Sequence, residues 1–437
     1  MKERQFLSLL DHTAPNLSFQ NEPSWMSDRR TSALEQLTEL DLPSTNLEDW
    51  RRTDVRGLSI DQFCLPMPED IDPSLGPNQP ENTELLAGLM MQQNGVTLDQ
   101  IGELDSVYFA DFQTALEEKP DLLREYMGQA IRRNPSKDLS IFDVMQSAFL
   151  QGGYVLYIPT GVVVEKPFQV FKTLNGSSVA DFSNTLIIAE DNSQATVLEL
   201  QGSARENQAG LHCGAVEIFV GSNAHLNFVQ IQDFNQQTWN FSTQRALIQQ
   251  SANLRWITAC LGSRLSKIDQ LAELSESGAN VDMLGLAFAQ KRQHLDVHTY
   301  QKHSAAHTTS DLLYQNVLTD RSRTVWRGMI EVVKGAQEID AYQKNENLLL
   351  DKRARADTIP GLEILADEVR CTHGATAGPV DPEQVYYLMS RGLSPEWAER
   401  TVVEGFFEPI LQRIPSIDLR QRLTESVQNK LAMAHKT

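Results

Sequence analysis

Gln194-Ala195-Thr196-Val197 returns as Asn223-Ala224-His225-Leu226, Ser251-Ala252-Asn253-Leu254 and Gly278-Ala279-Asn280-Val281, more loosely as Ala305-Ala306-His307-Thr308, and again as Gly335-Ala336-Gln337-Glu338. Each copy has an alanine after a turn of small or polar residues, then one variable residue, then an apolar or strand-like run. Successive alanines lie 29, 28, 27, 27 and 30 residues apart. A unit of about 28 residues therefore repeats along the chain.

A repeat of this length with strand-like content predicts a solenoid of stacked β coils, in which each coil leaves backbone groups for the next coil to pair with. A β-sandwich is the alternative, because its turns also recur along the chain. The strand-like region is longer than two hundred residues, which is unusually large for a sandwich. The sequence therefore favours a mainly β fold with a parallel β-helix core over residues 151–378.

The boundaries of this core are marked by changes in pattern. From Gly152 the chain consists of short strand-like runs bounded by Gly, Asn, Asp or Ser. After Gly378 helical spacing returns. The predicted strands are 154–159, 185–189, 196–200, 216–220, 226–231, 283–288 and 329–333, and the predicted C-terminal helices are 381–389, 395–407 and 416–433. Residues 379–437 form a C-terminal helical region.

Residues 1–150 are predicted to be an N-terminal helical region with a Pro-rich linker. Five prolines between residues 65 and 82 exclude a regular helix or an inner strand there. From residue 85 to 149 the spacing is helical again, and Pro120 suits the start of a helix. We expect the two terminal regions to cap the open edges of the β stack.

The composition excludes several classes of partner. The chain has 437 residues and a formal net charge of −20, whereas a nucleic-acid or anionic-membrane binder normally has a basic face. The four cysteines lie far apart without a CxxC pair, which indicates a reducing compartment. With no signal peptide or long apolar run, we predict a cytoplasmic protein. A plastid protein whose transit segment has been removed is the alternative.

The motifs of common enzyme classes are missing. There is no GxxxxGK[ST] loop, no dinucleotide fingerprint after a strand and no GxSxG elbow. We therefore expect no ATP hydrolysis by this chain and no enzymatic activity.

The sharpest chemical feature is the pair Cys371 and His373. On a strand this spacing places both side chains on one face, where a thiolate and an imidazole can bind one metal. Two ligands fall short of the usual four, so the others would come from elsewhere in the fold or from another chain. The opposing interpretation is a buried cysteine beside a hydrogen-bonded histidine.

A second group, His294, His298, His303 and His307, has no HExxH-type carboxylate. We expect these histidines on successive strands and corners, in surface or packing roles. The tryptophans at positions 50, 239, 256 and 326 are expected in the core or at an interface.

Four segments together resemble the SufB/SufD family of the SUF iron-sulfur cluster assembly system. They are Asn46–Asp54 around Trp50-Arg51-Arg52-Thr53, Gly153–Pro167, His303–Leu349, and Cys371–Gly378 followed by Tyr386-Tyr387-Leu388, Ser390-Arg391-Gly392-Leu393 and Glu404-Gly405-Phe406. The resemblance spans most of the chain.

This resemblance implies a right-handed parallel β-helix flanked by helical regions. It also implies a non-catalytic scaffold that pairs with SufB and binds the ATPase SufC through residues 379–437, which agrees with the missing ATP-binding loop. No tightly bound cofactor is expected in the isolated chain. A nascent iron-sulfur cluster is expected in the complex.

Within the family, the SufD branch fits better than SufB. SufB proteins carry a sulfur-accepting cysteine and a His-Glu-Ala-Thr run, whereas this chain has Ala354 and His373-Gly374-Ala375-Thr376 at the corresponding positions. The resemblance marks His373 as important for cluster building at the SufB interface, with Cys371 beside it. Two alternatives remain: a SufB-like or homodimeric scaffold, and a β-helix enzyme acting on polysaccharide.

Overall fold

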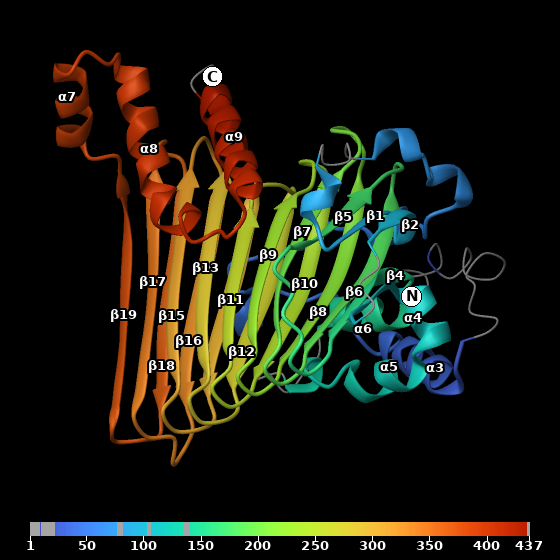
Figure 1. The fold of residues 1–437 in the computed structure, drawn as a ribbon. Coiled ribbons are helices and arrows are strands. Elements are labelled where there is room, and N and C mark those ends of the chain that lie inside the picture. The colour runs from blue at the N-terminus through green and yellow to red at the C-terminus, as the bar shows by residue number, and fades with distance from the viewer. Residues whose placement is uncertain (1–8, 10–21, 77–81, 103–105, 134–139, 435–437) are drawn as a thin grey trace.

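The computed structural model describes residues 9, 22–76, 82–102, 106–133 and 140–434. It is mainly β, with 44% strand and 24% helix, and forms a parallel β-solenoid of about eight turns. Figure 1 shows the strands stacked side by side across the molecule, with helices beside both ends of the stack. The predicted parallel β-helix with terminal helices is therefore confirmed.

The solenoid consists of two sheets, and successive strands of the chain alternate between them. The odd-numbered sheet runs in the order β19 (Val369–Pro379), β17 (Ile339–Leu349), β15 (Thr309–Leu318), β13 (Asn280–Ala289), β11 (Asn253–Cys260), β9 (His225–Asp233), β7 (Gln194–Ser203), β5 (Phe168–Leu174), β1 (Gly88–Gln93) and β2 (Val96–Ile101). The even-numbered sheet runs in the order β18 (Arg355–Ile364), β16 (Arg323–Val332), β14 (His294–His303), β12 (Leu265–Leu274), β10 (Thr238–Ile248), β8 (Gly210–Val220), β6 (Val179–Ala189), β4 (Gly152–Ile158), and then β3 (Tyr108–Asp111). All seven predicted strands fall on observed ones.

The repeat in the sequence corresponds to one coil of the solenoid. From β5 to β19, residues paired on neighbouring odd-numbered strands lie between 27 and 31 positions apart, as in Asn253 with Asn280 and Thr196 with Asn227. Ala224, Ala252 and Ala279 occupy equivalent positions immediately before β9, β11 and β13 and are fully buried. The other repeat alanines are displaced by a few residues from this register.

The interior between the two sheets holds the main apolar core. Alternate residues of each strand point inward, and among them are the fully buried Trp256 and Trp326. Trp50 and Trp239 are also buried, but they lie outside the solenoid under the N-terminal region. The expected core positions of these four tryptophans are confirmed.

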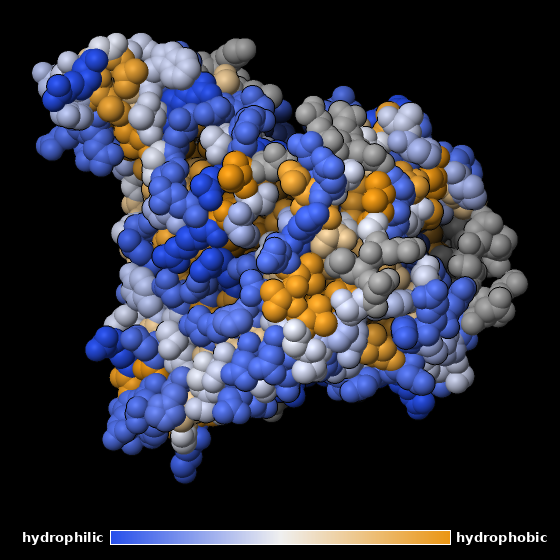
Figure 2. Space-filling view, in the orientation of Figure 1, coloured by the Kyte–Doolittle hydropathy of each residue, from blue (hydrophilic) through white to orange (hydrophobic). Residues whose placement is uncertain are grey.

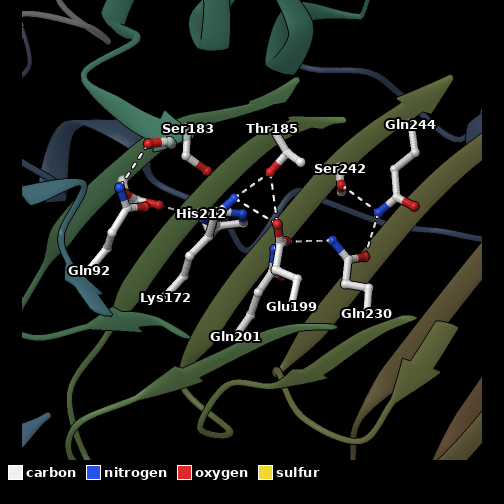
Figure 3. A network of polar contacts seen from close by, with 12 residues as sticks. Gln92, Lys172, Ser183, Thr185, Glu199, Gln201, His212, Gln230, Ser242 and Gln244 are labelled. Atoms are coloured by element: carbon white, nitrogen blue, oxygen red, sulfur yellow. Dashed lines mark hydrogen bonds and ion pairs between the residues drawn. The ribbon is translucent and has the colours of Figure 1, made fainter. Parts of the chain in front are cut away.

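The interior also contains a directed chain of polar side chains (Figure 3). The Lys172 ammonium lies 3.1 Å from Glu199 Oε2, and Gln230 Nε2 donates to Glu199 Oε1 at 2.9 Å. Gln244 donates to Gln230 at 2.7 Å, Gln270 donates to Gln244 at 2.9 Å, and the Tyr314 hydroxyl donates to Gln270. Every donor in this row of hydrogen bonds points towards Glu199, so the carboxylate sets the orientation of the amides.

The N-terminal region contains three strands, so the prediction of helix over residues 85–149 is wrong for residues 88–111. β1 and β2 form an antiparallel hairpin at one edge of the stack, and β3 pairs antiparallel with β4 at the other sheet. The hairpin turn is Asn94-Gly95, with positive φ at both residues. These strands, rather than helices, close the N-terminal edge.

The N-terminal helices cover the outer face of the even-numbered sheet. They are α3 (Ser24–Leu37), α4 (Phe112–Glu118), α5 (Pro120–Tyr126) and α6 (Ile141–Phe149), and six 3₁₀ turns accompany them: η3 (Glu48–Trp50), η4 (Ile60–Gln62), η5 (Pro68–Asp70), η6 (Pro73–Leu75), η7 (Thr83–Leu85) and η8 (Ile131–Arg133). α6 starts with a capping box between Ser140 and Asp143, and its Phe142 stacks on Phe241 of β10. The Pro-rich stretch forms only the short turns η5 and η6; residues 77–81 lie outside the described part.

The C-terminal helices are α7 (Pro382–Ser390), α8 (Pro395–Leu411) and α9 (Ile417–Ala434), as predicted. Phe407 of α8 and Val427 and Leu431 of α9 are buried against Val229 and Leu284 on the outer face of the odd-numbered sheet. The helices thus cover a sheet face and leave the edges of β18 and β19 unpaired, so the expected helical cap is wrong at this end. No helix in the described residues is long and apolar enough to cross a membrane.

Candidate functional site at the open end of the solenoid

Cys371 and His373 lie on β19, the last strand of the odd-numbered sheet (Figure 1). β19 pairs in register with β17, so that Cys371 is beside Ala341 and His373 is beside Gln343. Ala341 and Gln343 are buried and point into the solenoid. Because parallel neighbours in register share their side-chain direction, Cys371 and His373 face the same way, on the inner side of the open end.

The two side chains differ in environment. Cys371 is half-buried and packs at the margin of an apolar cluster that includes Ile339 and Ala341. Burial raises the pKa of the Cys371 thiol, and the negative charge of Asp340 raises it further. His373 is exposed. The arrangement therefore presents a protonated thiol next to an accessible imidazole.

The described part of the chain adds no third ligand to this pair, since no group of three or more His, Cys, Asp or Glu residues in it could hold a metal ion. The spacing argument correctly places the two side chains on one face. Any further ligands would have to come from outside the described residues, and the free edge of β19 is where a second chain has access.

The surface around the open end is partly apolar. Leu362 and Ile364 of β18 are 37% and 36% exposed, and Leu365 immediately after this strand is 57% exposed. Tyr342 of β17 is 37% exposed. Unpaired backbone groups on two neighbouring edge strands, together with apolar side chains, are typical of a surface that pairs with another chain.

A second surface with exposed apolar residues lies on α7 and α8. Tyr386, Tyr387 and Trp397 are 74%, 57% and 53% exposed. A groove of about 780 Å³ between these helices is lined by Tyr387, Leu388 and Phe406, among others. Figure 2 shows hydrophobic atoms gathered where α7 and α8 project from the body of the molecule.

Comparisons with known proteins show the family of this chain. The model of the SUF system FeS cluster assembly SufBD core domain matches residues 172–406, more than half of the chain, and the model of the SufBD N-terminal region matches residues 1–170. The chain belongs to the SufB/SufD family. Its relatives include iron-sulfur cluster assembly SufBD family proteins of Staphylococcus saprophyticus, 28% identical over 91% of this chain and 88% of the relative, and of Staphylococcus epidermidis, 28% identical over 90% and 87%.

The SufB/SufD-like N-terminal motif around Trp50 binds to the outer face of the even-numbered sheet. Lys267 of β12 lies 2.9 Å from Asp296 Oδ2, contacts the carbonyl of Asp49 at 3.0 Å, and sits 4.9 Å from the centre of the Trp50 ring. Although burial opposes ionisation of Asp296, Lys267 and His298 lower its pKa well below the usual value. The motif therefore covers a buried charged cluster.

Sequence reasoning missed this cluster because its members come from different coils. Thr53 Oγ1 lies 2.9 Å from His294 Nε2 and also bonds to Asp296, while Arg327 of β16 pairs with Asp49 at 2.9 Å. The only sequence signal was the Trp-Arg-x-Thr motif itself. A cavity of about 650 Å³ lies between residues 36–50, the start of α6 and the even-numbered sheet.

The prediction that the four clustered histidines fall on successive strands is wrong, whereas His307 does lie at a corner. Three of them lie on the single strand β14, and His307 lies in the turn after it. His294 and His298 point outward to the charged cluster, whereas His303 points inward between Thr308 and Ser310. The packing role expected for them agrees with the polar contacts that His294, His298 and His303 make.

Proposed function

We propose that this chain is the SufD-type, non-catalytic scaffold subunit of an iron-sulfur cluster assembly complex. In this proposal SufB pairs with the open end of the solenoid, and Cys371 and His373 form half of an assembly site that the partner completes. The observation that carries the proposal is the placement of both residues on the inner side of β19, the edge strand of its sheet.

The SufD rather than SufB assignment is supported by two positions. Ala354, where the resemblance places the sulfur-accepting cysteine of SufB, is 6% exposed and carries no reactive group. Gly374 replaces the glutamate of the His-Glu-Ala-Thr run. Both changes remove groups that handle sulfur or protons, which suits a subunit supplying fewer ligands than its partner.

The α7–α8 surface is the proposed docking site for the ATPase SufC. Tyr386, Tyr387 and Trp397 provide an apolar anchor of the composition found at interface hot spots. The surface lies at the same end of the molecule as β19, beyond the carboxyl ends of the last strands (Figure 1), so that it is beside the open edge and not on it. In this arrangement a nucleotide-driven movement of SufC acts on the helices that are anchored to the sheet.

The proposal is tested by substituting His373→Ala in the co-expressed complex with SufB and SufC. Complex formation is expected to persist, because His373 is exposed, whereas iron and sulfide content after reconstitution falls to near background. Thr372→Ala is the matched control, since its side chain lies on the opposite face of the same strand. Cluster assembly at the wild-type level in the His373→Ala complex would rule out the proposed role of this residue.

A further inference from the structure

The closed end of the solenoid contains a small polar cavity between β1, β5, β6 and β8. Its volume open to the centre of a water molecule is about 10 Å³, and Gln92, Lys172, Asp181, Ser183 and His212 line it. Each of these residues is at most 7% exposed. Figure 3 shows Gln92, Lys172, Ser183 and His212 converging at the end of the interior polar chain.

His212 and Asp181 form a buried pair on neighbouring strands. His212 Nδ1 lies 2.7 Å from Asp181 Oδ2, and because a carboxylate only accepts, the Nδ1–H group donates. In the tautomer that carries its proton on Nδ1, Nε2 is an acceptor. Gly214 leaves room for the ring, since a Cβ atom there would lie only 2.7 Å from His212 Nε2.

Two acceptors of this pair have no hydrogen-bond partner in the described part of the chain: His212 Nε2 and Asp181 Oδ1. The residues are 1% and 7% exposed, so bulk water does not reach them freely. A buried polar atom without a hydrogen-bond partner destabilises the folded chain. The cavity must therefore supply a group with two donors.

The surrounding charges select the chemistry of that group. Lys172 Nζ lies in the cavity wall, 2.6 Å from Thr185 Oγ1, and its positive charge disfavours a cation. The Asp181 carboxylate disfavours an anion. The cavity volume matches a single water molecule, which typically makes about three hydrogen bonds when buried.

We propose that this cavity binds one structural water molecule. Its two O–H groups donate to Asp181 Oδ1 and His212 Nε2, and its oxygen accepts from the hydroxyl of Ser183. The water thereby joins β6 and β8 inside the first coils and completes the polar interior next to Lys172.

A high-resolution crystal structure of the full chain, with and without a rubidium soak, tests the occupant directly. We expect one density peak within hydrogen-bonding distance of Asp181 Oδ1, His212 Nε2 and Ser183 Oγ, without anomalous signal after the soak. A cavity without density, or a peak with a rubidium signal, would overturn the proposal.

Thermal unfolding of Ser183→Ala provides a second measurement. This variant loses the donor to the water and should unfold at a lower temperature than Ser193→Ala, a matched control. Ser193 is also buried and its hydroxyl has no protein partner in the described residues, but it lies outside the cavity. Equal unfolding temperatures for the two variants would contradict a bound water at Ser183.

Discussion

The buried ion pair Lys172–Glu199 shows how single residues stabilise a polar interior. Burial opposes ionisation of Glu199, but Lys172 and the hydrogen bonds from Gln230 and Thr185 outweigh it and lower the pKa of the carboxyl group. The carboxylate then orders four donors in a row. A charge at this position is tolerated only because its partner and its hydrogen bonds are both present.

Lys172→Met is expected to destabilise the protein by about 3–5 kcal/mol, because it leaves the Glu199 carboxylate buried and unpaired. The double variant Lys172→Met with Glu199→Gln should recover much of this loss. Denaturant unfolding monitored by far-UV circular dichroism measures both. A double variant as unstable as Lys172→Met alone would show that the unpaired charge is not the cause.

We expect the protein to lose stability in mild acid because of the buried ring of His303. Burial lowers the pKa of His303 from 6.5 to about 4, and the ring nitrogens lie within hydrogen-bonding distance of Thr308 and Ser310. The unfolded chain therefore binds the proton more tightly, and stability falls as the pH decreases from about 6.5 towards 4, by up to about 3 kcal/mol. The denaturation midpoints at pH 7 and pH 5 should differ less in His303→Gln than in the wild-type protein. An unchanged difference would show that His303 is not the source of the loss of stability in acid.

For single residues, the sequence predicted their relative positions only where they are neighbours in the chain. The spacing of Cys371 and His373 predicts their common face because alternation along a strand is local. The contacts of Lys267 with Asp49 and Trp50 join parts of the chain more than two hundred residues apart, and nothing in either segment specifies the other.

Among the elements, the coils were predictable and the N-terminal strands were not. Residues 85–91 form an apolar run without alternation, which a buried strand and a buried helix share. The Asn94-Gly95 pair did carry a hairpin signal. The apolar faces of α8 and α9 predicted helices correctly, but periodicity does not say which surface a helix covers.

The helix pair α7–α8 yields a test of partner binding. Trp397→Ala should weaken SufC binding at least tenfold, because a half-exposed tryptophan is typical of an interface anchor. Ile417→Ala is the control, since this residue of α9 is 78% exposed but lies on another helix. Calorimetric titration with SufC compares the two variants, and unaltered affinity for Trp397→Ala would place the docking surface elsewhere.

For the whole molecule, the two ends of the solenoid are different: antiparallel strands close one, and the other is open. Leu365→Glu at the open end should therefore impair pairing with SufB, because it introduces a charge into an apolar contact. Val163→Glu, near the closed end, is the control, since Val163 and Leu365 are 58% and 57% exposed. Co-purification yields measure the effect; equal losses would argue against the open end as the partner surface.

The in-register coils also restrict how the length of such a chain can change during evolution. An insertion of one residue within a strand would turn the later inward side chains of that strand outward, whereas adding a coil of 27 to 31 residues preserves the pairings. Each added coil would move the edge that carries Cys371 and His373 by about 4.8 Å. Homologues are thus expected to differ in the strand region by whole coils or by loops at the corners, and a gained coil would change the distance between the two partner surfaces.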